Sequence, residues 1–192
     1  MFPVTITGER VVLREFTEDD VDAVLAVYGD PVVTEHLSFD PRERGQVVRT
    51  IETVTRAARA EPRTEYSLAV AFADTGRCIG FARLAVDSTH PGQSSAQLGF
   101  AVRADLWGRG LGEETVRLLL RLGFEGLGLH RLWGARSPEN TASDQLMRKL
   151  GMIEEGRIRH HLKIGDAWRD SIVHSILEDE WRTQVTAVES NV

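Results

Sequence analysis

Three glycines alternate with other residues in the segment Leu106-Trp107-Gly108-Arg109-Gly110-Leu111-Gly112-Glu113-Glu114, which lies between a predicted strand and a predicted helix. Glycine lets backbone N–H groups approach an anion closely, and a helix N-terminus adds a favourable partial positive charge. The junction therefore predicts a site for a phosphate-bearing ligand. Taken alone, an ordinary turn with flexible glycines is the alternative.

Two common nucleotide-binding motifs do not match this junction. The dinucleotide fingerprint requires a third glycine three residues after the second, where this chain has Glu113, and it follows the first strand of a parallel βαβ unit. A P-loop requires Gly-Lys followed by Ser or Thr, which is absent. The predicted ligand is therefore a phosphate-bearing molecule of another kind.

The elements that must position this junction form a mixed series of strands and helices. Period-two runs bounded by turn residues predict strands, and apolar residues at helical spacing predict helices. The expected strands are 10–15, 66–73, 77–87, 95–102, 130–135, 153–164 and 167–177, and the expected helices are about 18–28, 41–60, 110–122 and 141–150.

Composition limits both the size of the fold and its partners. A chain of 192 residues with 42% hydrophobic content predicts one domain, residues 1–184, followed by a disordered tail, residues 185–192. The net charge of −6 and the lack of a long basic cluster argue against nucleic acid. Without a leader-like N-terminus or an apolar run of about 18 residues, we expect a cytoplasmic protein with no membrane partner. The single cysteine, Cys78, is expected to be a buried structural thiol.

Five short motifs occur in an order and spacing that match one family. They are residues 99–103 (Gly-Phe-Ala-Val-Arg), the loop 107–112, Leu129-His130-Arg131, residues 138–143 (Pro-Glu-Asn-Thr-Ala-Ser) and residues 149–152 (Lys-Leu-Gly-Met). The chain resembles the GNAT superfamily of N-acetyltransferases over nearly its whole length, and most closely the branch named for ribosomal-protein alanine and serine N-terminal acetyltransferases. The resemblance implies an α/β (α+β) domain: a mixed, mostly antiparallel sheet of six to seven strands with helices on both faces. Strands 95–102 and 130–135 should splay apart to admit the pantetheine arm of the co-substrate.

The resemblance also implies where acetyl-CoA binds. Backbone N–H groups of the segment 109–112 would hold the pyrophosphate, and those of the segment 100–102 would pair with the pantetheine arm and form an oxyanion hole. Trp107 stands where many members carry Gln or Arg, and Trp is common there in this branch. The expected cofactor-binding residues are Phe100, Ala101, Val102, Trp107, Gly108, Arg109, Gly110, Leu111, Gly112, Asn140 and Ser143.

Acetyl transfer to an amine needs a neutral amine, a stabilised oxyanion and a proton for the departing thiolate. By resemblance, Asn140 contacts the CoA arm, and the Ser143 hydroxyl protonates or hydrogen-bonds the thiolate. An N-cap and a polar position in the first helical turn are the structural alternatives for these two residues. No motif fixes the general base, so the expected catalytic set is completed by position alone, and no metal is expected. The candidates for the base are Glu35, His36, His160 and Glu155, of which Glu35 and His160 join Ser143 and Asn140 in that set.

Because no motif identifies a general base, the pKa of the acceptor amine becomes important. A peptide α-amine, with a pKa near 8, costs about 1 kcal/mol to deprotonate at pH 7, whereas a lysine side chain costs about 4.6 kcal/mol. The sequence therefore favours transfer to a protein N-terminal α-amine. A small-molecule acyltransferase, acting on an antibiotic, a polyamine or a biosynthetic amine, and a non-catalytic acyl-CoA-binding module both remain open, as do the size of the acyl group and a homodimer.

Overall fold

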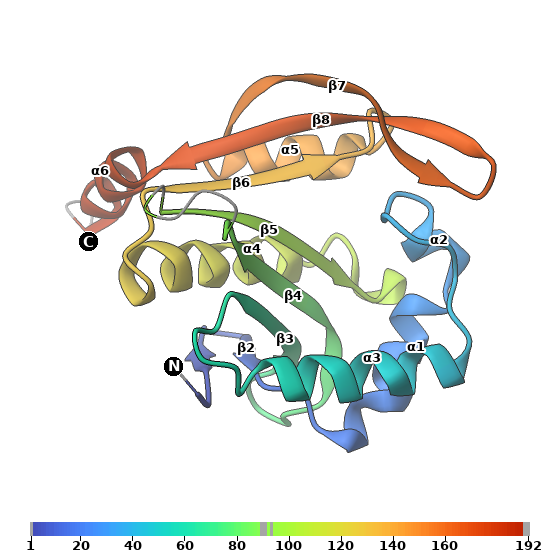
Figure 1. Cartoon of the computed structure of the whole chain (residues 1–192). Coiled ribbons are helices and arrows are strands. Elements are labelled where there is room, and N and C mark those ends of the chain that lie inside the picture. Colours follow the sequence, from blue (N-terminus) through green and yellow to red (C-terminus); the bar gives the residue numbers. More distant parts are fainter. Residues whose placement is uncertain (1, 89–91, 93, 190–192) are drawn as a thin grey trace.

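A computed structural model describes residues 2–88, 92 and 94–189, and it shows one central sheet (Figure 1). Eight strands lie in the order β1-β2-β3-β4-β5-β6-β8-β7. They are β1 (Thr5–Thr7), β2 (Val11–Arg14), β3 (Glu65–Phe72), β4 (Cys78–Val86), β5 (Ser95–Val102), β6 (Arg131–Arg136), β7 (Ile153–Ile164) and β8 (Ala167–Leu177). Every neighbouring pair is antiparallel except β5 and β6, which are parallel.

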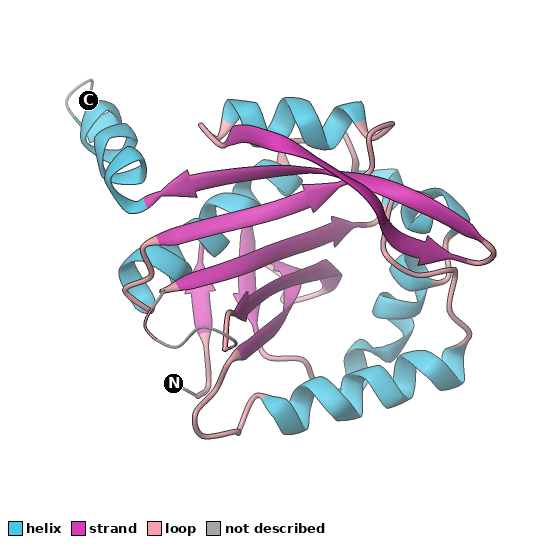
Figure 2. Cartoon of the chain, turned by 45° about the horizontal axis from the view of Figure 1, so that its top comes forward, coloured by secondary structure: helices cyan, strands magenta, loops and turns pink. Residues whose placement is uncertain are grey.

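Helices cover both faces of the sheet, as predicted (Figure 2). Residues of α4 and α5 belong to the larger hydrophobic core on one face, and residues of α1 and α3 belong to a second core on the other face. The helices are α1 (Val21–Tyr28), α2 (Pro31–Thr34), α3 (Arg44–Ala57), α4 (Leu111–Arg121), α5 (Thr141–Lys149) and α6 (Glu178–Glu189), with short helical turns at Glu18–Asp20, Ala104–Leu106 and Leu122–Gly126.

The two cores follow from the alternation of side chains along the central strands. Leu68 and Val70 of β3 face the larger core, whereas Ala69 between them faces the smaller one. Helix α4 buries Leu111, Leu118 and Leu119 against the larger core, which fixes the position of its N-terminus beside β5. The glycine junction is therefore anchored from its helical side.

Two predictions about the elements need correction. The sheet has eight strands instead of six to seven, because β1 has only three residues, too few to show a periodic pattern, and is formed by its pairing with β2. Residues 185–189 are helical and belong to α6, where we expected disorder; residues 190–192 lie outside the described part of the chain. The Trp181 ring of α6 stacks on Phe124 at 6.0 Å, and this contact accounts for the helix docking on the domain.

Cys78 is buried at the start of β4, and burial raises the pKa of its thiol to about 11. A neutral thiol inside the smaller core is not a nucleophile, because the thiolate is the reactive form. Within the described ranges, no helix is both long and apolar enough to cross a membrane.

Candidate active site

The glycine junction forms a tight loop that ends at the N-terminus of α4. Gly108 and Gly110 have φ angles of +73° and +76°, in the left-handed region that favours glycine, and Gly110 is the N-cap of the helix. Gly108, Arg109 and Gly110 are exposed, whereas Leu111 is buried as the first residue of α4. The loop therefore offers free backbone to solvent at a helix N-terminus, which suits an anion.

Arg10 fixes this loop to the start of β2. Its Nη1 donates to the carbonyl oxygen of Arg109 at 2.8 Å, and its Nε donates to Glu114 Oε2 at 3.0 Å. Partial burial raises the pKa of Glu114, but hydrogen bonds from the backbone of Arg10 and Val11 and from the Arg10 guanidinium together lower it below its ordinary value. The sequence did not single out Arg10.

The neighbouring acid in the first turn of α4 is also paired. Glu113 accepts from Lys149 Nζ at 2.6 Å and from Arg117 Nη2 at 3.1 Å. The Lys149 hydrogen bond is the main cause that lowers the pKa of Glu113. Each carboxylate beside the glycine loop therefore has a cation partner that offsets its repulsion of a bound phosphate.

Trp107 links the loop to the end of β5. The indole is half exposed, and its Nε1 donates to the carbonyl oxygen of Val102 at 2.7 Å. This bond uses one acceptor position of a strand residue that we expected to pair with the pantetheine arm. The side chain therefore positions the loop relative to the strand.

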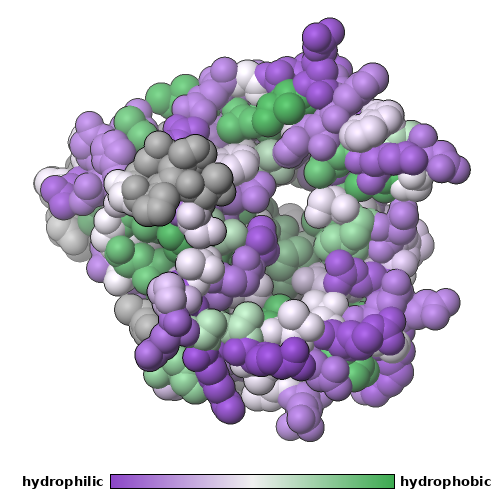
Figure 3. All heavy atoms as spheres, in the orientation of Figure 1, coloured by the Kyte–Doolittle hydropathy of each residue, from purple (hydrophilic) through white to green (hydrophobic). Residues whose placement is uncertain are grey.

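Strands β5 and β6 separate where the expected gap lies. They pair only through Ser95↔Arg131, Ala96↔Leu132 and Gln97↔Trp133, so the segment 98–102 pairs with β4 on one side and has no β6 partner on the other. Ala101 and Val102 are buried, and Phe100 is half-buried. A Cβ placed on Gly112 would lie 3.3 Å from the Phe100 ring and 3.5 Å from Leu146, so α4, β5 and α5 meet beside this gap. Figure 3 shows the molecule hollowed between the two parts of the sheet.

Helix α5 begins on the far side of the gap with the two predicted catalytic residues. Asn140 is its N-cap, and the Oδ1 atom accepts from the backbone N–H of Ser143 at 2.9 Å. Asn140 therefore performs the structural role named as its alternative. The hydroxyl of the half-buried Ser143 has no hydrogen-bond partner among the residues that the structure describes, which leaves it free for a ligand.

Arg136, at the end of β6, holds the turn before α5. Its Nη1 donates to the carbonyl oxygens of Ser137 and Pro138 at 3.2 and 3.1 Å, and its Nη2 donates to Asp144 Oδ1 at 2.7 Å. Its Nε donates to Nε2 of His174, an imidazole that is fully buried on β8. The turn that carries the N-cap of α5 is therefore tied to the neighbouring strand.

His174, Asp144 and Glu154 also form a group whose ligand atoms lie within 4.8 Å of one another, a spacing that could hold a metal ion. Arg136 lies among them: besides the bonds to His174 and Asp144, its Nη2 is 3.8 Å from Glu154 Oε2. A metal ion there would face the repulsion of this guanidinium. The arrangement is an ion-pair network around an arginine.

The candidates for the general base lie at the α2 end of the molecule or on β7. Glu35 is exposed just after α2, and its backbone carbonyl accepts from Arg169 Nη1 at 3.2 Å. Glu155 of β7 is bound by Arg131 at 2.7 and 2.5 Å, and this pair is the main cause that lowers its pKa, so Glu155 is a weak base. The sequence could not indicate this pair, because the partners belong to different strands.

His160 lies in an irregular part of β7. The register shifts between Ile158 and Leu162, and His160 has a φ of +48°, with its backbone N–H donating to Asp170 Oδ1 at 2.7 Å. Its exposed ring stacks on Trp168, with 6.1 Å between ring centroids. The local strain is thus held by a side-chain acceptor and an aromatic contact.

Two residues that the sequence did not single out, Arg169 and Glu139, lie where the segment after α2 meets β8 and the turn before α5. Arg169 of β8 donates through Nη2 to the carbonyl oxygen of Leu37 at 2.7 Å, in addition to its bond with Glu35. Glu139, in the turn before α5, accepts from the Ser137 hydroxyl at 2.6 Å, and this hydrogen bond is the main cause that lowers its pKa. Smaller contributions to the Glu139 shift come from His36 and Arg169, which therefore face the same turn.

Comparison with known proteins identifies the family. The model of a family described as "Acetyltransferase (GNAT) domain" matches residues 10–153, which is most of the chain. "Uncharacterized N-acetyltransferase p20" of Bacillus licheniformis is 27% identical over 92% of this chain and 98% of its own length. Spermidine N(1)-acetyltransferase of Escherichia coli (strain K12) is 27% identical over 45% of this chain and 46% of its own length.

Solved structures share the fold. An acetyltransferase (GNAT family) from Bacillus anthracis superposes with a TM-score of 0.79 at 22% identity and covers 92% of this chain and 99% of that chain. The ribosomal-protein-S5-alanine acetyltransferase from Vibrio fischeri has a TM-score of 0.73 at 20% identity, covering 93% and 98%. The chain therefore belongs to the GNAT family of acetyltransferases and is an acyltransferase enzyme.

Proposed function

We propose that this enzyme transfers the acetyl group of acetyl-CoA to the α-amine of a peptide or protein N-terminus. The observation that carries the proposal is the gap in the sheet: the segment 98–102 of β5 has no partner on its β6 side, and the loop 108–110 leads from the same strand into the N-terminus of α4. An extended thioester arm beside β5 and a pyrophosphate at the helix N-terminus fit these two features. Membership of the GNAT family supports acetyl-CoA as the co-substrate.

The chemistry assigns one task to each side of the gap. The neutral amine attacks the thioester carbonyl carbon, a C–N bond forms, and backbone N–H groups of β5 stabilise the oxyanion. The C–S bond then breaks, and the hydroxyl of Ser143 protonates the leaving thiolate. Asn140 keeps Ser143 in the first turn of α5 through the bond from its amide oxygen. The proton released by the amine passes to solvent, since no motif fixes a general base, and a proton from solvent restores the Ser143 hydroxyl.

The absence of an assigned base supports an acceptor with a low pKa. A peptide α-amine is partly neutral at pH 7, whereas a lysine or polyamine nitrogen needs about 3 to 4 kcal/mol more to lose its proton. The fold shared with the Vibrio fischeri S5-alanine enzyme is consistent with an α-amine acceptor. The partial match with spermidine N(1)-acetyltransferase makes a polyamine the second candidate.

The co-substrate site is tested with two glycine variants matched in backbone strain. Gly110→Glu places a carboxylate in the loop, and Gly76→Glu places one in the β3–β4 turn, where φ is +68° and a Cβ meets nothing within 4 Å. Acetyl-CoA at 100 times its Kd should stabilise the wild type and Gly76→Glu by about 2.7 kcal/mol in thermal unfolding. It should leave Gly110→Glu unchanged. No stabilisation of the folded wild type would disprove the proposed co-substrate.

The acceptor is tested by following thiol release at pH 7 with short peptides that have a free α-amine. The matched substrates are the same peptides with an acetylated N-terminus and one lysine, and spermidine. We expect turnover of the α-amine peptides to exceed that of the other two. Faster turnover of the lysine side chain or of spermidine would contradict the α-amine assignment.

A further inference from the structure

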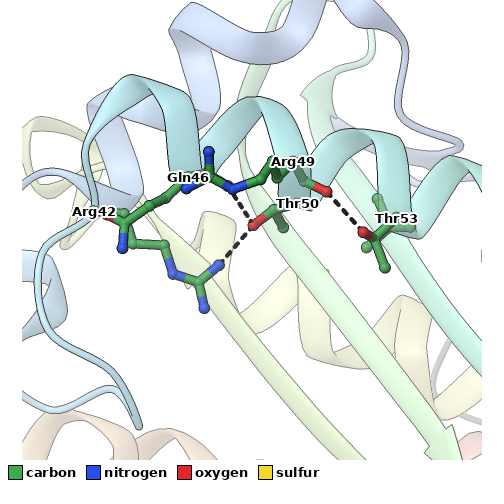
Figure 4. Close-up of a pocket in the computed structure, with 6 residues that line it drawn as sticks. Arg42, Gln46, Arg49, Thr50 and Thr53 are labelled. Atoms are coloured by element: carbon green, nitrogen blue, oxygen red, sulfur yellow. Dashed lines mark hydrogen bonds between the residues drawn. The ribbon is translucent and has the colours of Figure 1, made fainter.

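A surface cavity of about 430 Å³ lies along helix α3, on the face of the sheet opposite α4. It is lined by Arg42, Gln46, Arg49, Thr50, Thr53 and Val54 (Figure 4). Two arginines and four uncharged residues form its wall, and none of the six is acidic. In a chain with a net charge of −6, this is a local concentration of positive charge.

Arg42 is held in place without a counter-charge. Its guanidinium carbon lies 4.1 Å from the Phe39 ring centroid and 5.1 Å from that of Tyr28, and its Nη1 donates to the Thr50 hydroxyl at 2.8 Å. Burial raises the pKa of Tyr28 to about 12, so this phenol stays neutral. Within the described part of the chain, neither Arg42 nor Arg49 forms an ion pair.

A rigid guanidinium with unused donors suits a carboxylate. The planar fork of N–H groups matches the two oxygens of a carboxylate, and a group already fixed by aromatic contacts loses little side-chain entropy on binding. The side-chain amide nitrogen of Gln46 adds a donor on the same wall, and the exposed Arg49 adds a second cation. The Thr53 hydroxyl already donates to the carbonyl oxygen of Arg49 at 2.8 Å. A cationic polyamine would meet repulsion at this cavity.

Two aromatic contacts connect the cavity to the gap in the sheet. The Tyr28 ring, which lies under Arg42, contacts the Phe81 ring edge-on with centroids 5.0 Å apart. Phe81 of β4 pairs with Ala101 of β5, and both residues belong to the core on this face. An extended peptide rises about 3.3 to 3.6 Å per residue. About three residues therefore span the distance from the Arg42 guanidinium past Tyr28 to Phe81.

We propose that the cavity at Arg42 and Arg49 binds an acidic side chain of the acceptor, about three residues after the amine that receives the acetyl group. This inference rests on the proposed function and narrows its substrate class to peptides with an acidic residue near the N-terminus. Arg42 and Arg49 are then specificity-determining residues, and the reaction at the gap proceeds without them on neutral peptides.

The experiment uses two six-residue peptides with a free N-terminal serine that differ only by Glu or Gln as the fourth residue, three residues after the reacting amine. The value of kcat/KM is measured for the wild type, Arg42→Gln, Arg49→Gln and Arg56→Gln. Arg56 is an exposed arginine of α3 that does not line the cavity, so its variant controls for a lost charge. We expect the wild type and Arg56→Gln to prefer the Glu peptide about tenfold. The preference should disappear in Arg42→Gln and shrink in Arg49→Gln.

Equilibrium binding of the same peptides in the presence of CoA separates this inference from the proposed function, because it needs no turnover. Tighter binding of the Glu peptide that depends on Arg42 supports the inference even if no acetyl transfer occurs, and the proposed function then fails alone. Acetyl transfer with equal kcat/KM for both peptides in the wild type overturns the inference and leaves the function standing. Equal binding of both peptides, or binding of neither, also overturns it. Arg49→Gln keeps the test valid if Arg42→Gln unfolds, because the Arg49 side chain is exposed.

Discussion

Ser143 and Asn140 lie in the same turn of α5 but differ in their contribution to the fold. The amide oxygen of Asn140 accepts the N-cap hydrogen bond from Ser143, so removing this side chain would affect the helix as well as ligand binding. The Ser143 hydroxyl has no partner among the described residues, so its loss costs the fold little. The two residues can therefore be separated by experiment.

Removal of the Ser143 hydroxyl tests the proposed proton transfer. In Ser143→Ala we expect kcat to fall about a hundredfold, as is typical when a proton donor is lost, with an unchanged KM for acetyl-CoA. Thr141→Ala removes an exposed hydroxyl from the same turn and should leave kcat intact. Steady-state kinetics at pH 7 measures both variants. A normal kcat in Ser143→Ala would remove this residue from the mechanism.

His174 predicts a pH dependence of stability. Burial, together with the nearby Arg136 guanidinium, lowers its pKa below the ordinary value of about 6.5. The unfolded chain therefore takes up this proton first as pH falls, and the free energy of unfolding decreases below about pH 6.5. Carboxylates with lowered pKa values, such as Asp144, act in the same direction at lower pH.

Urea unfolding at pH 7.5, 6.5 and 5.5 measures this slope. His174→Gln should flatten this slope, because residue 174 then has no imidazole that could take up a proton when the chain unfolds. His130→Gln, which changes an exposed imidazole, is the control for the loss of a histidine. Equal slopes in the wild type and His174→Gln would show that other groups cause the decline.

Arg169 connects strand β8 with the segment that follows α2. Burial lowers the pKa of Arg169, and its guanidinium bonds the backbone carbonyls of Glu35 and Leu37. Its Nε is buried without a partner among the described residues. A residue of the β7–β8 hairpin thereby fixes a segment more than a hundred positions earlier in the chain.

Loss of this link should loosen the acceptor side of the molecule. We expect Arg169→Gln to raise the KM of a peptide acceptor several-fold without changing the KM for acetyl-CoA, since the glycine loop lies on another part of the fold. Arg159→Gln, which changes an exposed arginine of the same hairpin, is the control. Initial rates with each substrate varied in turn measure both constants. An equal rise in both KM values would contradict an effect limited to the acceptor side.

Prediction from sequence succeeded where the local pattern decides the structure. Strands β5, β7 and β8 have the predicted bounds, because their strand-like runs end at turn residues such as Gly165 and Asp166. It failed for β1 and α6, which are held by pairing with β2 and by the packing of Trp181 on Phe124. Such contacts join distant segments and leave no local signal.

The same division applies to the site. The glycine loop, the gap beside β5 and the start of α5 lie where the motifs place them. Arg10, Arg136 and Arg169 were missed because each acts through partners that only folding brings near, such as Glu114, which is 104 residues from Arg10. An arginine in a sequence does not reveal whether it is solvated or ties two elements together.

At the scale of the whole molecule, the sheet consists of two antiparallel parts, β1–β5 and β6–β8. Among the described residues, three parallel residue pairs join β5 to β6, and the adjacent carbonyl oxygen of Ser94 accepts from the backbone N–H groups of His130 and Arg131. Hydrogen exchange should therefore show fast exchange of β5 amides that face the gap, and acetyl-CoA should slow it in the peptide that spans 98–112. The paired strands β3 and β4 serve as the internal reference. Unchanged exchange in 98–112 at saturating acetyl-CoA would contradict binding in the gap.

The short seam between β5 and β6 has a consequence for how the enzyme comes apart. If an extended arm of the co-substrate lies along β5, it serves as a guest strand and completes a ladder that the polypeptide leaves unfinished. The empty enzyme should then yield to mechanical pulling at the seam first, with each part of the sheet holding together longer. The loaded enzyme should rupture as one unit, so that its co-substrate acts as a removable piece of its secondary structure.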